Sequence, residues 1–459
     1  MISSRLLELL REWVPRQRWY TNKGRTPVFS DVAQWELPSE EAGVGIRIHL
    51  LADTAGERPV LFQIPVTSRT EPLFGGGAAL IGTELIGTDG ATLYYDGPHD
   101  GAFADAVLAL AVGDANSGGS DRALTGTALT TLVHTNFGGS RVLSGEQSNT
   151  SIIVDAAETG GIPVICKIFR VLHPGENPDV AVQCALAGVG STRVPKPLGY
   201  LTGEWNDPRS GRPTRGHVAF AQEFLPGVED AWRVALRAVA AGDDFTERAR
   251  SLGAATAEVH SDLARAFPTV PATAESIAAM IDGMRERYRI ARYDVPSLGD
   301  YADAVEAALT AAGTAQWPLL QRIHGDYHLG QVLWAPGRGW MLIDFEGEPL
   351  RPMDERGHPD APLRDVAGMM RSLSYVAGSV ARSEGPGADD AVTAWVEAAR
   401  ESFLDGYADA SGRDPRDTAA LLAAFELDKA LYEARYEARN RPDWLPIPLQ
   451  AVRRLCGTG

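Results

Sequence analysis

One segment of the chain, HGDYHLGQVLWAPGRGWMLIDFEGEP at residues 324–349, constrains the fold more than any other. Asp326 follows an apolar stretch, and Gln331 comes five residues later. An apolar strand then ends at Asp344, with Glu346 just beyond it. Carboxylates at the point where a strand leaves the core are typical ligands of hard cations. Each half alone could form an ordinary polar turn, but the two halves at this spacing favour a single site.

Composition and charge limit what such a site can bind. The 459 residues, 44% apolar and 22% charged, predict two or three folded units. A formal charge of −17 disfavours nucleic acids and anionic membrane surfaces, which require clustered Lys and Arg, and favours a neutral or cationic small molecule. Three scattered cysteines are too few for a disulfide framework, so a reducing compartment is expected. No run of about eighteen apolar residues occurs, and we therefore expect a cytoplasmic protein with no membrane contact.

Local patterns divide the chain into a β-rich first half and a helical second half. Residues 28–95 alternate short β-type runs with Gly-rich turns and predict an antiparallel sheet. Helices are predicted at 101–112 and at about 178–188, and the polar sequence GDANSGGSDR at 113–122 is the best linker candidate. From about residue 228 onward, long alanine-rich helices dominate.

Three features of the first half suit a bound nucleotide. The sequence LSGEQSNTS at 143–151 is a polar hairpin tip whose backbone N–H groups could cover phosphates, although alone it is best read as a plain hairpin. Lys167 lies in an apolar strand and either has an anionic partner or reaches water from an edge strand. The strand AFAQEFLPG at 219–227 ends in a turn whose backbone could pair with adenine.

Aromatic and acidic side chains recur on the helix predicted near the C-terminus. Tyr432 and Tyr436 are four residues apart on one face, and Glu433 and Glu437 share the adjacent face. Rings beside carboxylates are typical of sugar sites, whereas the alternative is an ordinary amphipathic helix with Glu–Arg pairs. Further candidates for the same site are Tyr375, Trp444 and His328.

Six motifs follow one another along the chain: SGEQSNTS, CKIFR, QEFLPG, HGDYHLGQVL, DFEGEP and PLRDVAGMMRS. In these motifs and their order, the chain resembles the actinobacterial maltokinases and the related glucosamine kinases. Both groups belong to the aminoglycoside-phosphotransferase-like branch of the protein-kinase fold. The sequences RQRWYTNKGR and YEARYEARNRPDWLPIPL resemble the same group, so the resemblance spans nearly the whole chain. It implies an α+β, bilobal, protein-kinase-like fold in three parts. These are an N-terminal α/β cap at 1–95, a β-rich ATP-binding lobe at 96–225, and a mostly helical catalytic and acceptor-binding lobe at 226–459.

The resemblance also implies ATP and Mg²⁺ as cofactors and assigns roles by motif. Asp326 would orient or deprotonate the acceptor hydroxyl, and Lys167 would hold the α- and β-phosphates. The metal would be coordinated by Gln331 and Asp344, with Glu346 close by. The residues implied to bind the nucleotide are Ser144, Gln147, Ser148, Asn149, Thr150 and, through the backbone, Glu223 and Leu225. The residues expected near the acceptor are His328, Tyr375, Glu433, Tyr436, Glu437 and Trp444.

One departure from the family pattern concerns the partner of Lys167. Ala181 stands where a maltokinase would carry a glutamate that pairs with this lysine. Either Asp179 or Glu176 replaces that glutamate, or the pair forms only on closure.

Other departures bear on the acceptor, because Thr21, Asn22 and Ser374 differ from the expected maltokinase residues and suggest the glucosamine-kinase side of the group. The predicted reaction is therefore ATP-dependent phosphorylation of glucosamine to glucosamine 6-phosphate, and the alternative is phosphorylation of maltose to maltose 1-phosphate. An aminoglycoside phosphotransferase or a non-catalytic nucleotide-binding pseudokinase is less expected. The partner is a small-molecule sugar or amino sugar, and the oligomeric state is left open.

Overall fold

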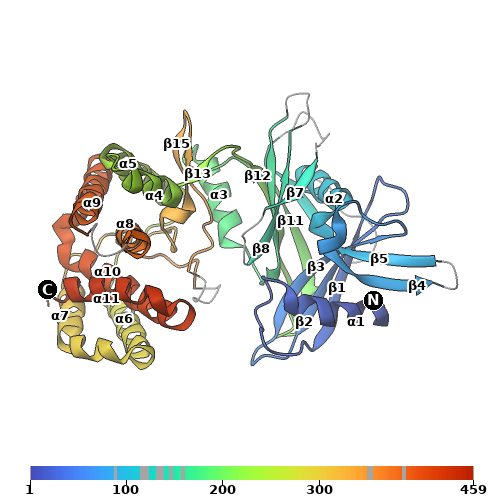
Figure 1. The fold of residues 1–459 in the computed structure, drawn as a ribbon, viewed down its shortest axis with the longest axis horizontal. Coiled ribbons are helices and arrows are strands. Elements are labelled where there is room, and N and C mark those ends of the chain that lie inside the picture. The colour runs from blue at the N-terminus through green and yellow to red at the C-terminus, as the bar shows by residue number, and fades with distance from the viewer. Residues whose placement is uncertain are drawn as a thin grey trace. The chain divides into compact units, whose positions relative to one another are not determined.

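The fold of the chain combines sheets in its first half with helices in its second half, which confirms the predicted α+β class (Figure 1). The computed structural model describes residues 2–86, 90–113, 123–130, 139–143, 148–156, 161–348, 355–384 and 389–457. Contacts divide the chain into two compact units, residues 1–181 with 195–226 and residues 182–194 with 227–459. No helix in the described ranges is long and apolar enough to cross a membrane. The finer division at 95 and 225 stays a prediction.

The first sheet of the first unit is antiparallel and carries the N-terminal helix α1 (Ser4–Trp13). Its strands follow the order β1 (Phe29–Leu37), β2 (Gly45–Asp53), β3 (Val60–Arg69), β5 (Gly90–Asp96) and β4 (Leu80–Ile86). Leu6, Leu10 and Trp13 recur at helical spacing on α1 and are buried against the sheet, while Ser3 caps the helix by accepting a hydrogen bond from the N–H of Leu6. The amphipathic N-terminal segment therefore forms a helix whose apolar face packs on the first sheet.

The second sheet of this unit is also antiparallel. Its order is β6 (Thr125–Ala128), β11 (Pro197–Asn206), β12 (Pro213–Glu223), β9 (Val164–Phe169), β8 (Asn149–Val154) and β7 (Ser140–Val142). Helix α2 (Gly101–Val112) packs on β6 and β11, and α3 (Pro178–Gly188) follows β10 (Val171–Leu172). Because β10 pairs with β3, the chain that leaves β9 becomes a strand of the first sheet. Most of the predicted linker, residues 114–122, lies outside the described residues.

The second unit is built from helices around one apolar core. Its long helices are α4 (Ala231–Ala241), α5 (Thr246–Ala266), α6 (Ala274–Asp294), α7 (Ala302–Gly313), α8 (Leu363–Glu384), α9 (Asp389–Ser411), α10 (Ala419–Asn440) and α11 (Pro446–Leu455). A small sheet has the order β13 (Glu229–Asp230), β14 (Val332–Ala335) and β15 (Gly339–Leu342). In this unit, short 3₁₀ helices lie at Pro296–Tyr301, Leu329–Gln331, Pro415–Thr418 and Pro442–Trp444. In the first unit, short 3₁₀ helices lie at Val14–Arg16, Gly76–Ala79 and Gly97–His99.

Helices α5 and α9 approach each other closely because each helix places a glycine against the backbone of the other. A Cβ atom at Gly253 would lie 1.9 Å from the carbonyl oxygen of Phe403, and one at Gly406 would lie 1.9 Å from that of Arg250. Neither position can carry a larger side chain without separating the helices.

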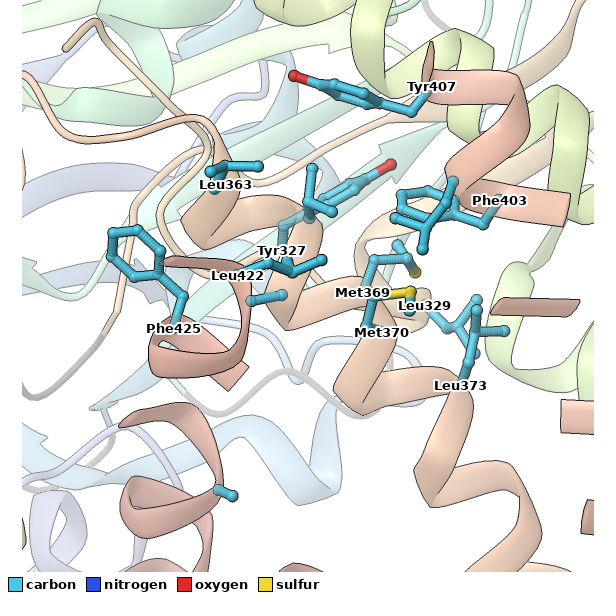
Figure 2. Close-up of a cluster of buried hydrophobic side chains, with 14 of the residues drawn as sticks. Tyr327, Leu329, Leu363, Met369, Met370, Leu373, Phe403, Tyr407, Leu422 and Phe425 are labelled. Atoms are coloured by element: carbon cyan, nitrogen blue, oxygen red, sulfur yellow. The ribbon is translucent and has the colours of Figure 1, made fainter. Parts of the chain in front are cut away.

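The core of the second unit also anchors the segment that carries Asp326. Figure 2 shows Tyr327 and Leu329 among apolar side chains that include Met369 and Leu373 of α8. Tyr327 is 2% exposed and Leu329 is fully buried, so the segment is anchored by every second residue. The polar residues on either side of Tyr327, Asp326 and His328, are thereby held at defined positions.

Candidate active site

The loop that carries Asp326 is held in place by one buried carboxylate, that of Asp365. Asp365 of α8 accepts hydrogen bonds from the backbone N–H of His324 (2.7 Å) and of Gly325 (2.9 Å), and His260 of α5 contacts the same carboxylate at 3.1 Å. His324 itself contacts the carbonyl oxygen of Ile343 through Nε2 at 3.0 Å. The loop that carries Asp326 is thus tied both to α8 and to the strand end that leads to Asp344.

Asp326 is paired with a lysine that sequence reasoning missed. The ammonium of Lys429, on α10, lies 3.0 Å from Oδ1 of Asp326 and 3.3 Å from Oε1 of Glu348, and it stands over the ring of Tyr432. Burial is the largest influence on the pKa of Asp326 and raises it, but the charge of Lys429, its hydrogen bond and smaller contributions from neighbouring residues together hold the pKa below its usual range. The carboxylate is therefore ionised at neutral pH and able to accept a hydroxyl proton. The spacing of Lys429 one helical turn before Glu433 was the available sequence signal.

The candidate metal ligands come together in the second unit. Nε2 of Gln331 donates to Oδ2 of Asp344 at 2.9 Å, and a carboxylate oxygen of Asp344 lies within 4.8 Å of one of Glu346. Asp344 has φ 65°, a left-handed conformation found at no other non-glycine position in the described residues. Such backbone strain concentrates at functional sites. Two carboxylates and an amide oxygen are hard donors, which fit Mg²⁺.

His328 lies beside this group but serves the turn that follows it. Its Nδ1 accepts a hydrogen bond from the N–H of Gly330 at 3.1 Å, which caps the 3₁₀ helix at Leu329–Gln331. Burial lowers the pKa of His328 below its usual value despite the negative charges of Asp326 and Asp344. The imidazole is therefore neutral at pH 7 and helps to shape the loop.

In the first unit, Lys167 is paired with Asp179. The ammonium of this β9 lysine lies 2.9 Å from Oδ2 of Asp179, which stands in the first turn of α3 and is 1% exposed. Glu176 is exposed. The acid that accompanies the strand lysine is thus Asp179, two residues before Ala181.

The predicted nucleotide residues lie on β8 and at the end of β12. Ser151 on β8 is in register with Lys167, whereas the hydroxyl of Thr150 accepts a hydrogen bond from Nε of the buried Arg170 at 2.8 Å. The O–H donor of Thr150 is not used by this contact. The N–H of Leu225 forms no hydrogen bond with another described residue, as an adenine-binding position requires. Asn149 begins β8 beside Ser148, and Ser144 and Gln147 lie outside the described residues.

The candidate acceptor carboxylates of α10, Glu433 and Glu437, are paired with arginines, as in the Glu–Arg pairs of the alternative interpretation. Oε2 of Glu433 accepts hydrogen bonds from Nε (3.0 Å) and Nη2 (2.7 Å) of Arg371. Glu437 accepts two from Arg441 (2.7 and 2.9 Å) and a longer one from the hydroxyl of Tyr375 (3.3 Å). No described residue donates to Oε1 of Glu433, so this oxygen differs from both oxygens of Glu437. The i,i+4 spacing of Glu437 and Arg441 could have identified that pair.

Two of the aromatic candidates stack on each other. The rings of Tyr375 and Trp444 lie 6.4 Å apart between centroids with an interplanar angle of 16°. Tyr436 is 41% exposed, and its ring contacts the guanidinium of Arg441 at 5.5 Å. The structure therefore joins Tyr375 and Trp444 to Glu437, while Tyr436 lies toward solvent.

The residues that suggested a particular acceptor serve structural contacts. Nδ2 of Asn22 donates to Asp53 at 2.8 Å, beside the hydroxyl of Tyr20. The hydroxyl of Ser374 donates to the carbonyl oxygen of Met370, and Arg400 of α9 donates to Ser374 at 3.1 Å. Both side chains stabilise the local fold, so these contacts give no reason to prefer one acceptor.

Comparisons with known proteins agree with the motifs. Residues 13–100 match the maltokinase N-terminal cap domain, and residues 140–422 match the phosphotransferase enzyme family. The chain is 34% identical to a glucosamine kinase of Streptacidiphilus jiangxiensis over 375 residues, which cover 76% of this chain and 80% of the relative. It is 32% identical to a glucosamine kinase of Mycolicibacterium smegmatis over 341 residues, which cover 70% of this chain and 80% of the relative.

Solved structures give the same result for the fold. A glucosamine kinase in complex with glucosamine, ADP and inorganic phosphate superposes with a TM-score of 0.66 at 25% identity, covering 98% of each chain. A second crystal form of a glucosamine kinase gives a TM-score of 0.68 at 23% identity, covering 98% of this chain and 99% of the other. The resemblance seen in the motifs is confirmed. The chain belongs to the phosphotransferase enzyme family, in the group that carries a maltokinase-type cap and includes the actinobacterial glucosamine kinases.

Proposed function

We propose that the protein transfers the γ-phosphoryl group of ATP to a hydroxyl group of glucosamine and that the product is glucosamine 6-phosphate. The observation that carries the proposal is the identity of about one third with two glucosamine kinases over 80% of their length, in a chain that retains an ionised Asp326 on an anchored loop. Family membership makes the protein a kinase, and the names of these relatives give the acceptor.

The protein's own groups account for the steps that surround phosphoryl transfer. Asp326 orients the acceptor hydroxyl and takes its proton, since its carboxylate is ionised and fixed by Lys429. Lys167, held by Asp179, binds the nucleotide phosphates. Gln331, Asp344 and Glu346 would hold Mg²⁺, which neutralises phosphate charge when it is bound. Catalysis of this kind depends on positioning and charge more than on covalent chemistry.

The amine of glucosamine can be assigned to one carboxylate on structural grounds. Glu433 lies four residues after Lys429 on α10, a rise of about 6 Å along the helix, which is close to the span of one sugar ring. Its Oε1 accepts no hydrogen bond from a described residue, and burial raises its pKa even beside Arg371. An ammonium group would relieve this unfavourable burial. Glu437 already accepts three hydrogen bonds and is the weaker candidate.

Maltose is the second candidate acceptor, and two observations favour it. Residues 13–100 match a maltokinase cap domain, and the stacked Tyr375 and Trp444 offer apolar ring faces beyond Glu437. A disaccharide longer than one hexose could extend from Asp326 toward these rings. Since ATP is the phosphoryl donor in either case, we place the reaction in the cytoplasm.

A panel of acceptors tests the proposal. ATP consumption is measured with Mg²⁺ and saturating ATP for glucosamine, glucose, maltose and one aminoglycoside, with the Asp326→Asn variant as the blank. The proposal predicts the highest kcat/KM for glucosamine. A higher kcat/KM for maltose or for the aminoglycoside would replace the assignment. ATP binding without turnover of any acceptor would instead support a non-catalytic role.

A further inference from the structure

The cap sheet contains a cavity of about 70 Å³ under the first turn of α1. Gly45, Arg47 and His49 alternate along β2 and therefore point to one face of the sheet. On the neighbouring β3, Ser68 is the cross-strand partner of Gly45 and reaches the same face. The cavity is thus lined by polar side chains together with the apolar Ile2, Leu6 and Val66, in an otherwise apolar interface between α1 and the sheet.

His49 is the residue that the fold alone does not explain. Its side chain is 2% exposed and lines the cavity, yet no described residue forms a hydrogen bond with its imidazole, whose Nδ1 is enclosed and whose other nitrogen, Nε2, is the one available to a ligand in the cavity. Its neighbours on this face, such as Leu51 and Ile64, are apolar. A buried polar group without a partner costs free energy, and such a group is usually satisfied by a water, an ion or a ligand. Burial lowers the pKa of His49 to about 4, so the imidazole is neutral and keeps one N–H donor.

The charged side chain at the cavity wall is a cation. Among the described residues that line the cavity, Arg47 is the only formally charged one, and its side chain is 56% exposed with a contact to Glu36 at 3.5 Å. An exposed pair of this length contributes little, so Arg47 can exchange Glu36 for another anion. Ser3 caps α1 at the same place, and the N-terminus of a helix carries a partial positive charge. The hydroxyl of Tyr94 is already used, because it donates to Glu84 at 2.6 Å.

We infer that this cavity of the cap binds a small oxyanion of the size of phosphate, with Arg47 as its counter-ion and His49 as a neutral hydrogen-bond donor. The volume exceeds what one water requires, which is about 10–15 Å³. The oxyanion is either free phosphate or the phosphate group of a phosphorylated sugar whose ring remains outside the cavity. The inference goes beyond the proposed kinase reaction and does not depend on it.

Calorimetric titration tests the site in the full-length protein saturated with ADP and Mg²⁺. Inorganic phosphate is titrated first and glucosamine 6-phosphate second, and the tighter of the two identifies the source of the oxyanion. Loss of one charge-assisted hydrogen bond costs about 1.5–3 kcal/mol, so Arg47→Met should weaken binding at least tenfold. His49→Phe, which fills the cavity and removes the donor, should weaken it as much, whereas His49→Gln should retain part of the affinity.

Two controls separate this site from other anion sites. Arg58→Met removes an exposed cation elsewhere in the cap and should leave the affinity unchanged. Lys167→Ala removes the cation proposed to hold the nucleotide phosphates and should also leave it unchanged. The inference is overturned if the parent protein binds neither anion, if Arg58→Met weakens binding as much as Arg47→Met, or if Lys167→Ala abolishes it. Arg47 is exposed, so its variant remains informative even where His49→Phe does not fold.

Discussion

At the scale of single residues, the pair of Asp326 and Lys429 is central to the electrostatics of the loop that carries Asp326. Burial would favour the protonated carboxylic acid, and the ammonium 3.0 Å away is the main contribution among those that together reverse that preference. In turn, Asp326 and Glu348 outweigh the burial of Lys429 and raise its pKa. The motif HGDYHLGQ predicted Asp326, but it contains no signal for Lys429, which is 103 residues away. This contact exists only because α10 packs against α8.

Replacing Lys429 should change the pH dependence of turnover. We propose Asp326 as an ionised base, and Lys429→Met removes a cation that lowers its pKa, so the pKa rises and a smaller fraction is ionised at a given acidic pH. The acid limb of the kcat profile should therefore move to higher pH. The profile is measured with saturating ATP and glucosamine, and Lys429→Arg is the matched control that retains the charge. An acid limb at the same pH in Lys429→Met would show that the pair does not tune the base.

Asp344→Asn should abolish most turnover and leave the protein folded. Asparagine tolerates the left-handed conformation that Asp344 adopts at φ 65°, so the strand end keeps its shape while one carboxylate ligand is lost. We expect kcat to fall by at least about 100-fold, by analogy with the loss of one charge-stabilising group in an active site. Circular dichroism and thermal unfolding monitor the fold. A kcat within tenfold of the parent would remove Asp344 from the metal site.

At the scale of helices and strands, regular periodicity was predictable and contacts between distant segments were not. The sequence predicted helices at 101–112 and about 178–188, and these are α2 and α3. The antiparallel sheet over residues 28–95 is also confirmed. By contrast, β10 has only two residues, too few for a pattern, and its pairing with β3 follows from tertiary packing. The acidic partner of Lys167 stayed open between Asp179 and Glu176 for the same reason. The choice depends on where α3 begins relative to β9, which is a matter of tertiary packing.

The contact between β9 and α3 yields a prediction about the nucleotide. Asp179→Asn removes the charge that holds the ammonium of Lys167, so the lysine should bind the phosphates less well. We expect KM for ATP to rise several-fold, with a larger rise in Lys167→Ala, which also lowers kcat. Glu176→Gln is the matched control, since Glu176 is exposed in the same segment. Equal effects of Asp179→Asn and Glu176→Gln would mean that the loss of a charge, and not the pair, matters.

At the scale of the whole molecule, the net charge of −17 has opposite consequences for the two proposed substrates, glucosamine and ATP. A field of this sign attracts the ammonium form of glucosamine and repels ATP, so the phosphates depend on local cations such as Lys167. Salt screens such long-range attraction within about 10 Å at 0.1 M ionic strength. The charge of the chain was readable from sequence, but its effect on an acceptor requires the position of individual carboxylates. Oε1 of Glu433 accepts no hydrogen bond from a described residue, so Glu433 is the carboxylate at which the attraction of an ammonium group can be measured.

Glucose provides the measurement, because it is nearly isosteric with glucosamine and lacks the amine. If Glu433 binds the ammonium, glucosamine should exceed glucose in kcat/KM by about 10- to 150-fold, which corresponds to one charge-assisted hydrogen bond of about 1.5–3 kcal/mol. Glu433→Gln keeps an oxygen for Arg371 while removing the charge, so it should lower activity with glucosamine and leave activity with glucose nearly unchanged. Glu437→Gln, whose carboxylate is already engaged by Arg441, is the control and should preserve the ratio. Glu433 does not select the amine if both variants lower the ratio of kcat/KM for glucosamine to kcat/KM for glucose by the same factor. The same conclusion follows if the parent protein uses the two sugars equally well.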